Sequence, residues 1–217
     1  MDQFVSANAT EGHALFLDCR DLSFEHVPVG GGDARIVILN SGVTRGLTDS
    51  GYNERRSACE RGAARLAAVS GQGITALRDV SPALLAEHWD LLDEEDYRRC
   101  RHVVGEIDRT REAVAKLRAS DLAAFGSLMD ASHNSLRDDY EVSGPELDAL
   151  VTIARSVDGV YGARLTGAGF GGCAVALAHR DAVDSLIDAV KAQYPGKSGL
   201  EAEAHVCRAV VGAGRVG

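Results

Sequence analysis

The sequence predicts an α+β fold, in which a short β-hairpin segment precedes a larger ferredoxin-like domain with inserted helices. Two short apolar runs near the start alternate as strands do, and a run of glycines then interrupts the chain. The remaining residues give the order strand, helices, strand, strand, helix, strand. That order is the split β-α-β arrangement of a ferredoxin-like domain, with helices inserted after its first crossover.

The predicted hairpin lies near the start of the chain. Residues 13–19 (HALFLDC) and 22–29 (LSFEHVPV) are apolar or alternating runs, as expected for two strands. The charged pair Arg20-Asp21 separates them. Such a short polar connection between two strand-like runs predicts an antiparallel pair.

A glycine-rich break at residues 30–33 predicts a domain boundary, because clustered glycines interrupt regular structure. We therefore divide the chain into residues 1–32, which hold the hairpin, and residues 33–217. The β-branched run at residues 35–39 predicts the first strand of the second unit.

Several helices are expected before the sheet resumes. The spacing of apolar residues predicts helices over residues 52–69, 94–117 and 121–135. A further helix is expected to begin within residues 143–146. There Ser143 can cap the helix, Pro145 suits the first turn and Glu146 can complete a capping box.

The end of the chain is predicted to complete the sheet. The expected elements are a strand at residues 160–166, a strand at 173–178, a helix at 181–194 and a strand at about 203–211. The two strands at 160–166 and 173–178 enclose a glycine-rich loop.

This loop contains four glycines within six positions, namely Gly167, Gly169, Gly171 and Gly172. The pattern G-x-G-x-x-G formally matches a dinucleotide fingerprint, but that motif requires a helix after it, whereas a strand is expected here. A Rossmann site is therefore rejected. Two interpretations remain open: a tight hairpin that needs positive φ, or a backbone platform beside a phosphate.

Composition excludes several classes of function. The chain has 217 residues, 45% apolar residues and a formal net charge of −9, which disfavours nucleic acid or an anionic membrane as a partner. Its five scattered cysteines include no Cys-x-x-Cys pair, which argues against a disulfide framework and favours a reducing, cytoplasmic location. No apolar run approaches the ~18 residues of a membrane-spanning helix.

Sequence motifs for metal chemistry are also missing. Neither a Walker lysine loop nor a His-Glu-x-x-His motif occurs, and the histidines show no ligand spacing, so no metal ligand is assigned. The adjacent carboxylates Asp138 and Asp139 could hold Mg²⁺, but a pair of this kind after a helix is more often solvated.

Four parts of the chain together resemble the galactokinase family of the GHMP small-molecule kinases. They are Met1-Asp2-Gln3 with residues 12–20 (GHALFLDCR); residues 40–60 (NSGVTRGLTDSGYNERRSACE); residues 99–114 with 132–148 (SHNSLRDDYEVSGPELD); and the glycine loop. The resemblance covers nearly the whole chain. It implies that residues 1–32 are a remnant of the family's N-terminal catalytic domain and that residues 33–217 are its ferredoxin-like C-terminal domain.

The resemblance also implies an activity, the transfer of the γ-phosphoryl group of ATP, with Mg²⁺, to the C1 hydroxyl of galactose. Asp2 would accept the proton of the sugar hydroxyl, and Tyr52 would hydrogen-bond the sugar. The phosphate-binding region would be supported by Gly167, Gly169, Gly171 and Gly172. Phosphoryl transfer depends mainly on positioning and charge neutralisation, so the completeness of the site matters.

Two family motifs, the sugar-recognition arm and the nucleotide loop, have no counterpart in this sequence. We therefore expect Met1 to be an internal methionine and the isolated chain to be a weak kinase. We also expect it to associate with itself or with a separate N-terminal half. Two alternatives remain open: a non-catalytic galactokinase-like protein that binds sugar or regulates a partner, and a kinase for another sugar or small alcohol.

Overall fold

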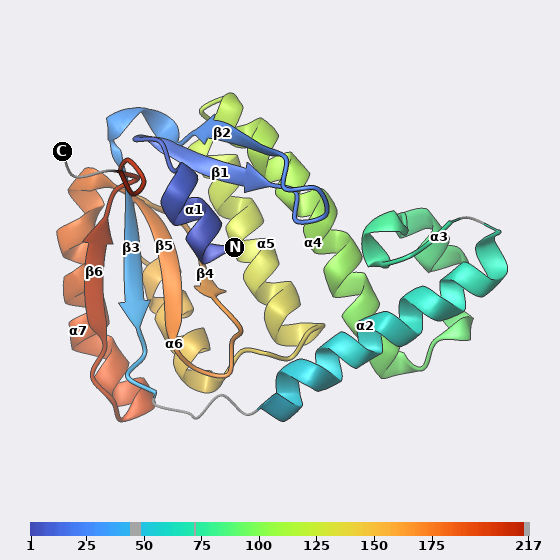
Figure 1. The fold of residues 1–217 in the computed structure, drawn as a ribbon. Coiled ribbons are helices and arrows are strands. Elements are labelled where there is room, and N and C mark those ends of the chain that lie inside the picture. Colours follow the sequence, from blue (N-terminus) through green and yellow to red (C-terminus); the bar gives the residue numbers. More distant parts are fainter. Residues whose placement is uncertain (44–48, 72, 215–217) are drawn as a thin grey trace.

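The computed structural model describes residues 1–43, 49–71 and 73–214. A two-stranded and a four-stranded antiparallel sheet are combined with α-helices and short 3₁₀ turns (Figure 1). The elements in chain order are α1 Asp2–Asn8, β1 His13–Leu17, β2 Phe24–Pro28, η1 Gly30–Gly32, β3 Ala34–Asn40, α2 Asp49–Ser70, η2 Leu77–Asp79, α3 Pro82–Glu87, η3 Trp89–Leu91, α4 Glu94–Arg118, α5 Leu122–Asp138, α6 Pro145–Arg155, β4 Val160–Thr166, β5 Cys173–His179, η4 Arg180–Ala182, α7 Val183–Ser198 and β6 Glu203–Cys207.

The four-stranded sheet has the order β4-β5-β3-β6, and every neighbouring pair is antiparallel. Numbered within the sheet, the strands run 2-3-1-4, which is the arrangement of a ferredoxin-like domain. In register, Val37 of β3 lies opposite Ala176 of β5 on one side and Val206 of β6 on the other. The predicted α+β class and strand order are therefore confirmed.

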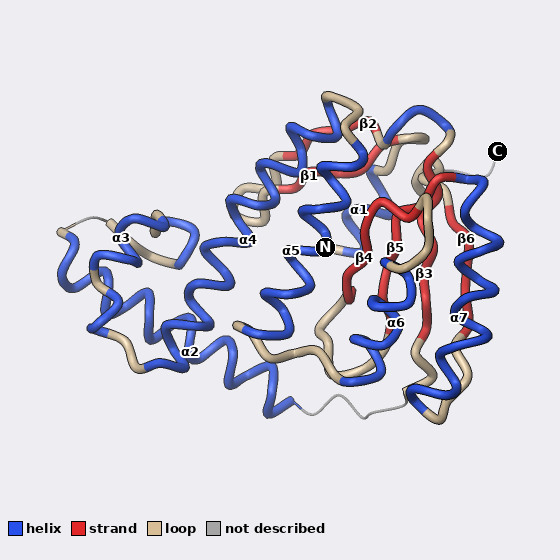
Figure 2. The backbone as a smooth tube through the Cα atoms, turned by 180° about the vertical axis from the view of Figure 1, so that it is seen from behind, coloured by secondary structure: helices blue, strands red, loops and turns tan. Residues whose placement is uncertain are grey.

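One face of this sheet carries the main core. Side chains alternate along a strand, so Ala174, Ala176 and Ala178 of β5 all point to the same face, where they are fully buried. Helices α6 and α7 cover that face (Figure 2). Tyr194 of α7 is also fully buried, and its hydroxyl donates a 2.8 Å hydrogen bond to the Ser41 carbonyl oxygen just after β3. This bond satisfies the tyrosine hydroxyl inside the core.

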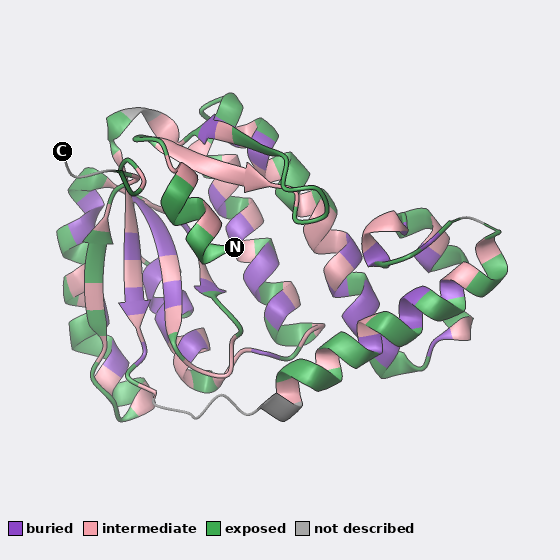
Figure 3. Cartoon of the chain, viewed as in Figure 1, coloured by how far each residue is buried: buried purple, intermediate pink, exposed green. Residues whose placement is uncertain are grey.

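The opposite face of the sheet is only partly covered. Ile36, Ile38 and Val175 point to this face and are half-buried. The helix α1 lies in front of β5 on this side in Figure 1, and it has no buried residue. Figure 3 shows that α1 and β6 are largely exposed, whereas buried residues gather on β3, β5 and the inner sides of the helices.

Helix α5 packs beside β4 with almost no space between the two backbones. Gly126 of α5 faces Tyr161 and Gly162 of β4, and a Cβ at position 126 would overlap the Tyr161 carbonyl oxygen and lie 2.9 Å from the Gly162 nitrogen. Glycine at both positions permits this approach. The contact aligns the end of α5 with the strand that leads into the glycine loop.

A helical lobe projects away from the sheet. It comprises α2, α3 and the first half of α4, with its own core around Leu66, Leu77, Cys100 and Val104 (Figure 1). The hairpin of β1 and β2 packs near the other end of α4, where Val27 meets Val114 and Leu117. Helix α4 therefore connects the lobe to the hairpin.

Several predictions about local structure need correction. The hairpin prediction is confirmed, but the last strand ends at Cys207, and the short helices α1 and α3 were not predicted. Ser143 does not cap α6: the N-cap is Gly144, without a side-chain bond, because the Ser143 hydroxyl donates instead to Asp148 at 2.6 Å. Pro145 does occupy the first turn, as predicted.

Candidate functional site

Asp2 lies exposed in the first turn of α1. The helix is held on the hairpin by an edge-to-face contact of Phe4 with Phe24, at 5.2 Å between ring centroids, and by His26, whose Nε2 lies 2.6 Å from the Asn8 carbonyl oxygen. The N-terminal end of α1 points toward the end of the sheet that bears the glycine loop (Figure 1). The start of a helix favours negative charge, because its free N–H groups point outward there.

Tyr52 lies in the first turns of α2 and is 60% exposed. Its side chain lines a cavity of about 710 Å³ between α2, η2 and α4. Arg56, Cys59, Arg78 and Tyr140 line the same cavity. Tyr52 is thus accessible to a small polar molecule. Residues 44–48 of the quoted 40–60 segment lie outside the described residues.

The glycine loop connects β4 to β5, and five of its six residues have positive φ angles. Gly167 and Gly169 both have φ +80°, and Gly171 and Gly172 have φ +131° and +81°. Phe170 between them also has positive φ, at +61°. These angles explain the choice of glycine, because they are strained for residues with a Cβ. The loop is therefore a hairpin connection that needs positive φ, and a role at a phosphate stays a proposal.

The loop is fastened to two other segments. The Phe170 N–H donates to the Val142 carbonyl oxygen at 2.7 Å, and the Ser41 N–H donates to the Gly172 carbonyl oxygen at 2.9 Å. The Arg55 guanidinium lies 5.6 Å from the centroid of the Phe170 ring. A Cβ at Gly51 would lie 2.9 Å from that ring. The first turns of α2 therefore pack directly on the loop, which brings the Tyr52 helix and the glycines together.

Asp2 is linked only indirectly to the Tyr52 helix and the glycine loop. Among the described residues, no hydrogen bond or ion pair links the Asp2 side chain to Tyr52 or to the glycine loop. Its position depends on α1, which is held by the hairpin and by the C-terminal segment, where the Ala213 N–H donates to the Ser6 carbonyl oxygen at 2.6 Å. Two of the three predicted parts of the site are thus in direct contact, and the third is attached indirectly.

A buried polar network, not assigned from the sequence, supports the loop. His133 of α5 is 1% exposed and accepts a 3.2 Å hydrogen bond at Nδ1 from the Leu165 N–H, one residue before β4 ends. Its Nε2 lies 3.2 Å from Asp148 Oδ1. Burial, reinforced by the charge of Arg155, lowers the pKa of His133 to about 4. The ring is therefore neutral at pH 7, and Nδ1 is free to accept.

The sequence held a signal for this network. Ser132 and His133 are polar residues at inward positions of a helix, both buried, and buried polar groups need partners. Ser132 donates to Glu106 at 2.7 Å. The quoted 132–148 segment therefore forms a support for the loop, a role that the resemblance alone did not specify.

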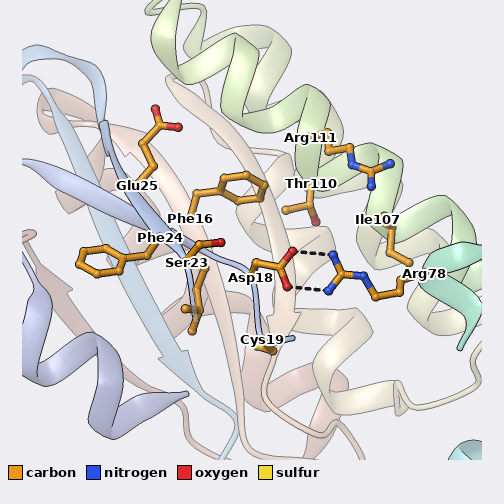
Figure 4. A pocket seen from close by; sticks show the side chains of 11 residues that line it. Phe16, Asp18, Cys19, Ser23, Phe24, Glu25, Arg78, Ile107, Thr110 and Arg111 are labelled. Carbon is orange, nitrogen blue, oxygen red and sulfur yellow. Dashed lines mark hydrogen bonds and ion pairs between the residues drawn. The ribbon is translucent and has the colours of Figure 1, made fainter. Parts of the chain in front are cut away.

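A second cavity, of about 450 Å³, lies between the hairpin turn and α4 (Figure 4). Asp18 and Arg78 point toward each other at one end of it and form a bidentate ion pair, with both distances 2.5 Å. Arg78 also lines the Tyr52 cavity, so the two cavities adjoin at this residue. Neither residue was singled out by the sequence.

A metal site is not evident in the part of the chain that is described. No group of three or more His, Cys, Asp or Glu side chains there could hold an ion. Asp138 pairs with Arg137 at 2.7 Å, and Asp139 pairs with Arg101 and with the Ser135 hydroxyl. Both carboxylates therefore pair with arginine side chains and are not simply solvated.

Comparison with known proteins gives a consistent result. Residues 113–196 match the family model described as GHMP kinases C terminal. The chain contains a GHMP kinase C-terminal domain. It is 46% identical over 216 residues to a galactokinase of Roseiflexus sp., covering 100% of this chain and 55% of the relative. It is 47% identical over 196 residues to a human galactokinase, covering 90% of this chain and 48% of that protein.

Solved structures of GHMP kinases agree with this assignment. The crystal structure of Lactococcus lactis galactokinase complexed with galactose matches with a TM-score of 0.92 and 40% identity, over 98% of this chain and 55% of that chain. L. major mevalonate kinase in complex with R-mevalonate, at 19% identity and TM-score 0.52, shares the fold, over 89% of this chain and 47% of that one. The chain thus spans about half the length of the relatives that it matches.

None of the helices in the described residues is long and apolar enough to cross a membrane.

Proposed function

We propose that this chain is the C-terminal part of a galactokinase, which transfers the γ-phosphoryl group of ATP to the C1 hydroxyl of galactose. The observation that carries the proposal is the match over 98% of the chain, at 40% identity, to an enzyme solved with galactose. In this proposal residues 1–32 belong to the family's N-terminal domain, and residues 33–217 form the C-terminal domain. A cytoplasmic location is part of the same proposal.

The proposed roles are those that the resemblance implies. The Asp2 carboxylate accepts the proton of the C1 hydroxyl, the hydroxyl oxygen forms a bond to the γ-phosphorus, and ADP leaves with the electrons of the broken P–O bond. Tyr52, exposed in the cavity between α2, η2 and α4, donates a hydrogen bond to the sugar. Gly167 and Gly172, where a Cβ would meet nothing within 4 Å, leave the loop backbone open to the phosphates.

Magnesium enters the proposal only with the nucleotide. Mg²⁺ in phosphoryl-transfer sites is usually held by one or two carboxylates together with the substrate phosphates. The described residues provide no ligand cluster for it. We therefore assign no residue of this chain to the ion and no step to its action.

The experiment combines the 217-residue polypeptide with a separately produced N-terminal half of a galactokinase. Galactose-dependent release of ADP is measured for the wild type, for Asp2→Asn and for Tyr52→Phe. We expect the mixture to turn over galactose, and Asp2→Asn to reduce kcat by about 10²- to 10⁴-fold, the usual value of a general base. Tyr52→Phe is expected mainly to raise the KM for galactose.

Three outcomes would contradict this proposal. Full activity of Asp2→Asn would remove the proton acceptor from the scheme. Binding of galactose by the mixture without any release of ADP would favour the non-catalytic, sugar-binding alternative instead. Turnover of a different sugar in preference to galactose would favour the other alternative, a kinase for another sugar or small alcohol.

A further inference from the structure

Two ion pairs join the hairpin turn to the helical lobe. The Asp18 carboxylate, one residue after β1 ends, accepts hydrogen bonds from both terminal nitrogens of Arg78 at 2.5 Å. Two residues along the turn, Arg20 contacts Asp79 at 2.9 and 3.1 Å. Each segment thus supplies one acid and one arginine, and each arginine crosses to the other segment. We call these four residues the turn clamp.

Further hydrogen bonds hold both carboxylates of the turn clamp in place. Asp18 accepts the Arg20 N–H at 2.8 Å. Asp79 accepts the N–H and the hydroxyl of Thr75, at 3.0 and 2.8 Å, and the N–H of Ala76 at 3.2 Å. Bidentate pairs with oriented partners are the geometrically specific form of a salt bridge. The pKa of each carboxyl is accordingly far below its ordinary value, chiefly through its arginine.

The hairpin contacts α4 through a small apolar cluster and one ion pair. The cluster consists of Val27, Val114 and Leu117, with a few half-buried neighbours, and the pair joins Glu25 to Arg118. The turn clamp lies at the opposite end of the strands, where the turn points toward the lobe (Figure 1). The turn clamp therefore adds a contact at the turn end of the hairpin.

The turn clamp lies on the path between two proposed site residues. On one side, α1 with Asp2 is seated on the hairpin through Phe4 and Phe24. On the other side, Leu77 of η2 is buried in the core that it shares with α2, the helix that bears Tyr52. Arg78 itself lines the Tyr52 cavity. The hairpin supports α1 together with the bond from the Ala213 N–H to the Ser6 carbonyl oxygen, so we expect a displacement of the turn to shift Asp2 relative to Tyr52.

We propose that Asp18, Arg20, Arg78 and Asp79 are positioning residues that set the placement of Asp2 against the Tyr52 helix. This inference rests on the proposed function for the roles of Asp2 and Tyr52. Its structural part, that the turn clamp orders α1 at a distance, stands independently. The two parts can be tested separately.

The structural test is hydrogen exchange by mass spectrometry on the 217-residue chain. Asp18→Asn and Arg78→Gln each remove one bridge, and the reversed pair D18R/R78D restores it with opposite polarity. We expect the single variants to speed exchange several-fold in α1 as well as in the turn, and the reversed pair to recover much of the protection of α1. Arg20→Gln tests the second bridge by the same readout.

The matched control is a different ion pair on the same hairpin. The Nη2 atom of Arg118 in α4 donates to both carboxylate oxygens of Glu25 in β2, each at 2.6 Å. Both side chains are about half exposed. Glu25→Gln removes that pair beside the apolar cluster rather than at the turn. We expect it to leave exchange in α1 at the wild-type rate. Equal acceleration of α1 in Glu25→Gln and Asp18→Asn would overturn the inference.

The functional test uses the mixture with the N-terminal half described above. Because a misplacement of about 1 Å can cost about 10²-fold in rate, Asp18→Asn is expected to lower kcat by about 10- to 10²-fold with the KM for ATP unchanged. Wild-type kcat in Asp18→Asn, in an active mixture, would overturn the positioning role. An inactive wild-type mixture would count against the proposed function, and the exchange experiment would still decide whether the turn clamp orders α1.

Discussion

Two glycines of the loop offer a controlled measurement of close backbone approach. Gly167 and Gly169 have the same φ of +80°, but their surroundings differ. A Cβ at position 167 would meet nothing within 4 Å. A Cβ at position 169 would overlap the Val142 carbonyl oxygen and lie 2.8 Å from the Val142 Cβ. The same substitution to alanine therefore adds a steric clash at one site only.

The expected magnitudes follow from these two settings. Alanine in the left-handed region costs about 1–2 kcal/mol, and the reduced freedom of the unfolded chain returns part of it, so Gly167→Ala should lose about 1 kcal/mol. Gly169→Ala should lose a further 1–3 kcal/mol or so, as overpacked sites do, because Val142 and its bond to Phe170 must shift. At about 2–4 °C per kcal/mol for a chain of this size, the Tm should fall by about 3 °C and about 6–12 °C respectively.

Thermal unfolding of the two variants beside the wild type measures the difference. Circular dichroism at pH 7 is sufficient, provided that both variants show a single transition. Equal shifts in Tm would refute the reasoning, since they would mean that the approach of Val142 contributes nothing. A larger loss in Gly167→Ala than in Gly169→Ala would refute it more strongly.

Three further predictions concern other parts of the chain. Gly126→Ala should lower the free energy of unfolding by about 1–3 kcal/mol, because α5 meets β4 there. Gly105→Ala in α4, where a Cβ would have only one neighbour at 3.7 Å, should raise it by about 0.5–1 kcal/mol. Equal denaturation midpoints for the two variants would contradict this. His133 is neutral in the fold, with its pKa lowered to about 4, so stability should fall as the pH drops from about 6.5 to 4 while the unfolded chain takes up the proton first. His133→Gln should flatten that fall only in part, because the pKa of His102 is also lowered to about 4 by burial; an unchanged pH slope of unfolding would exclude the effect. The 217-residue chain alone should self-associate in sedimentation and bind a hydrophobic dye, and a dye-silent monomer would contradict that expectation.

Strong local signals made much of the fold predictable. The strand Val160–Thr166 was predicted to the residue, because an apolar run ends at a glycine cluster there. Helix α3 was missed although Ser81 and Pro82 form a start signal, and the Ser81 hydroxyl does accept the Leu84 N–H at 3.1 Å. Helix α1 has seven residues, none of them buried, so it leaves no apolar stripe to detect.

Other features depend on contacts that local patterns cannot contain. The cap predicted at Ser143 failed because a side chain five residues away, Asp148, takes its hydroxyl. The pair of Asp18 and Arg78 joins residues that are 60 positions apart, and no local pattern links the two. The predicted site residues Asp2 and Tyr52 came from resemblance, and their roles stay predictions.

The arrangement of the site separates two kinds of failure. The glycine loop and the Tyr52 helix touch through Phe170, Gly51 and Arg55, so a change in the loop should disturb both phosphate and sugar contacts. Asp2 is carried by α1, which rests on the hairpin and on the C-terminal segment at residues 212–213, so loss of the turn clamp should disturb proton transfer while leaving those contacts intact. Variants of the loop should therefore raise KM values, and variants of the turn clamp should lower kcat. A turn-clamp variant that changed the KM for galactose and ATP as much as kcat would show that all three parts move as one body.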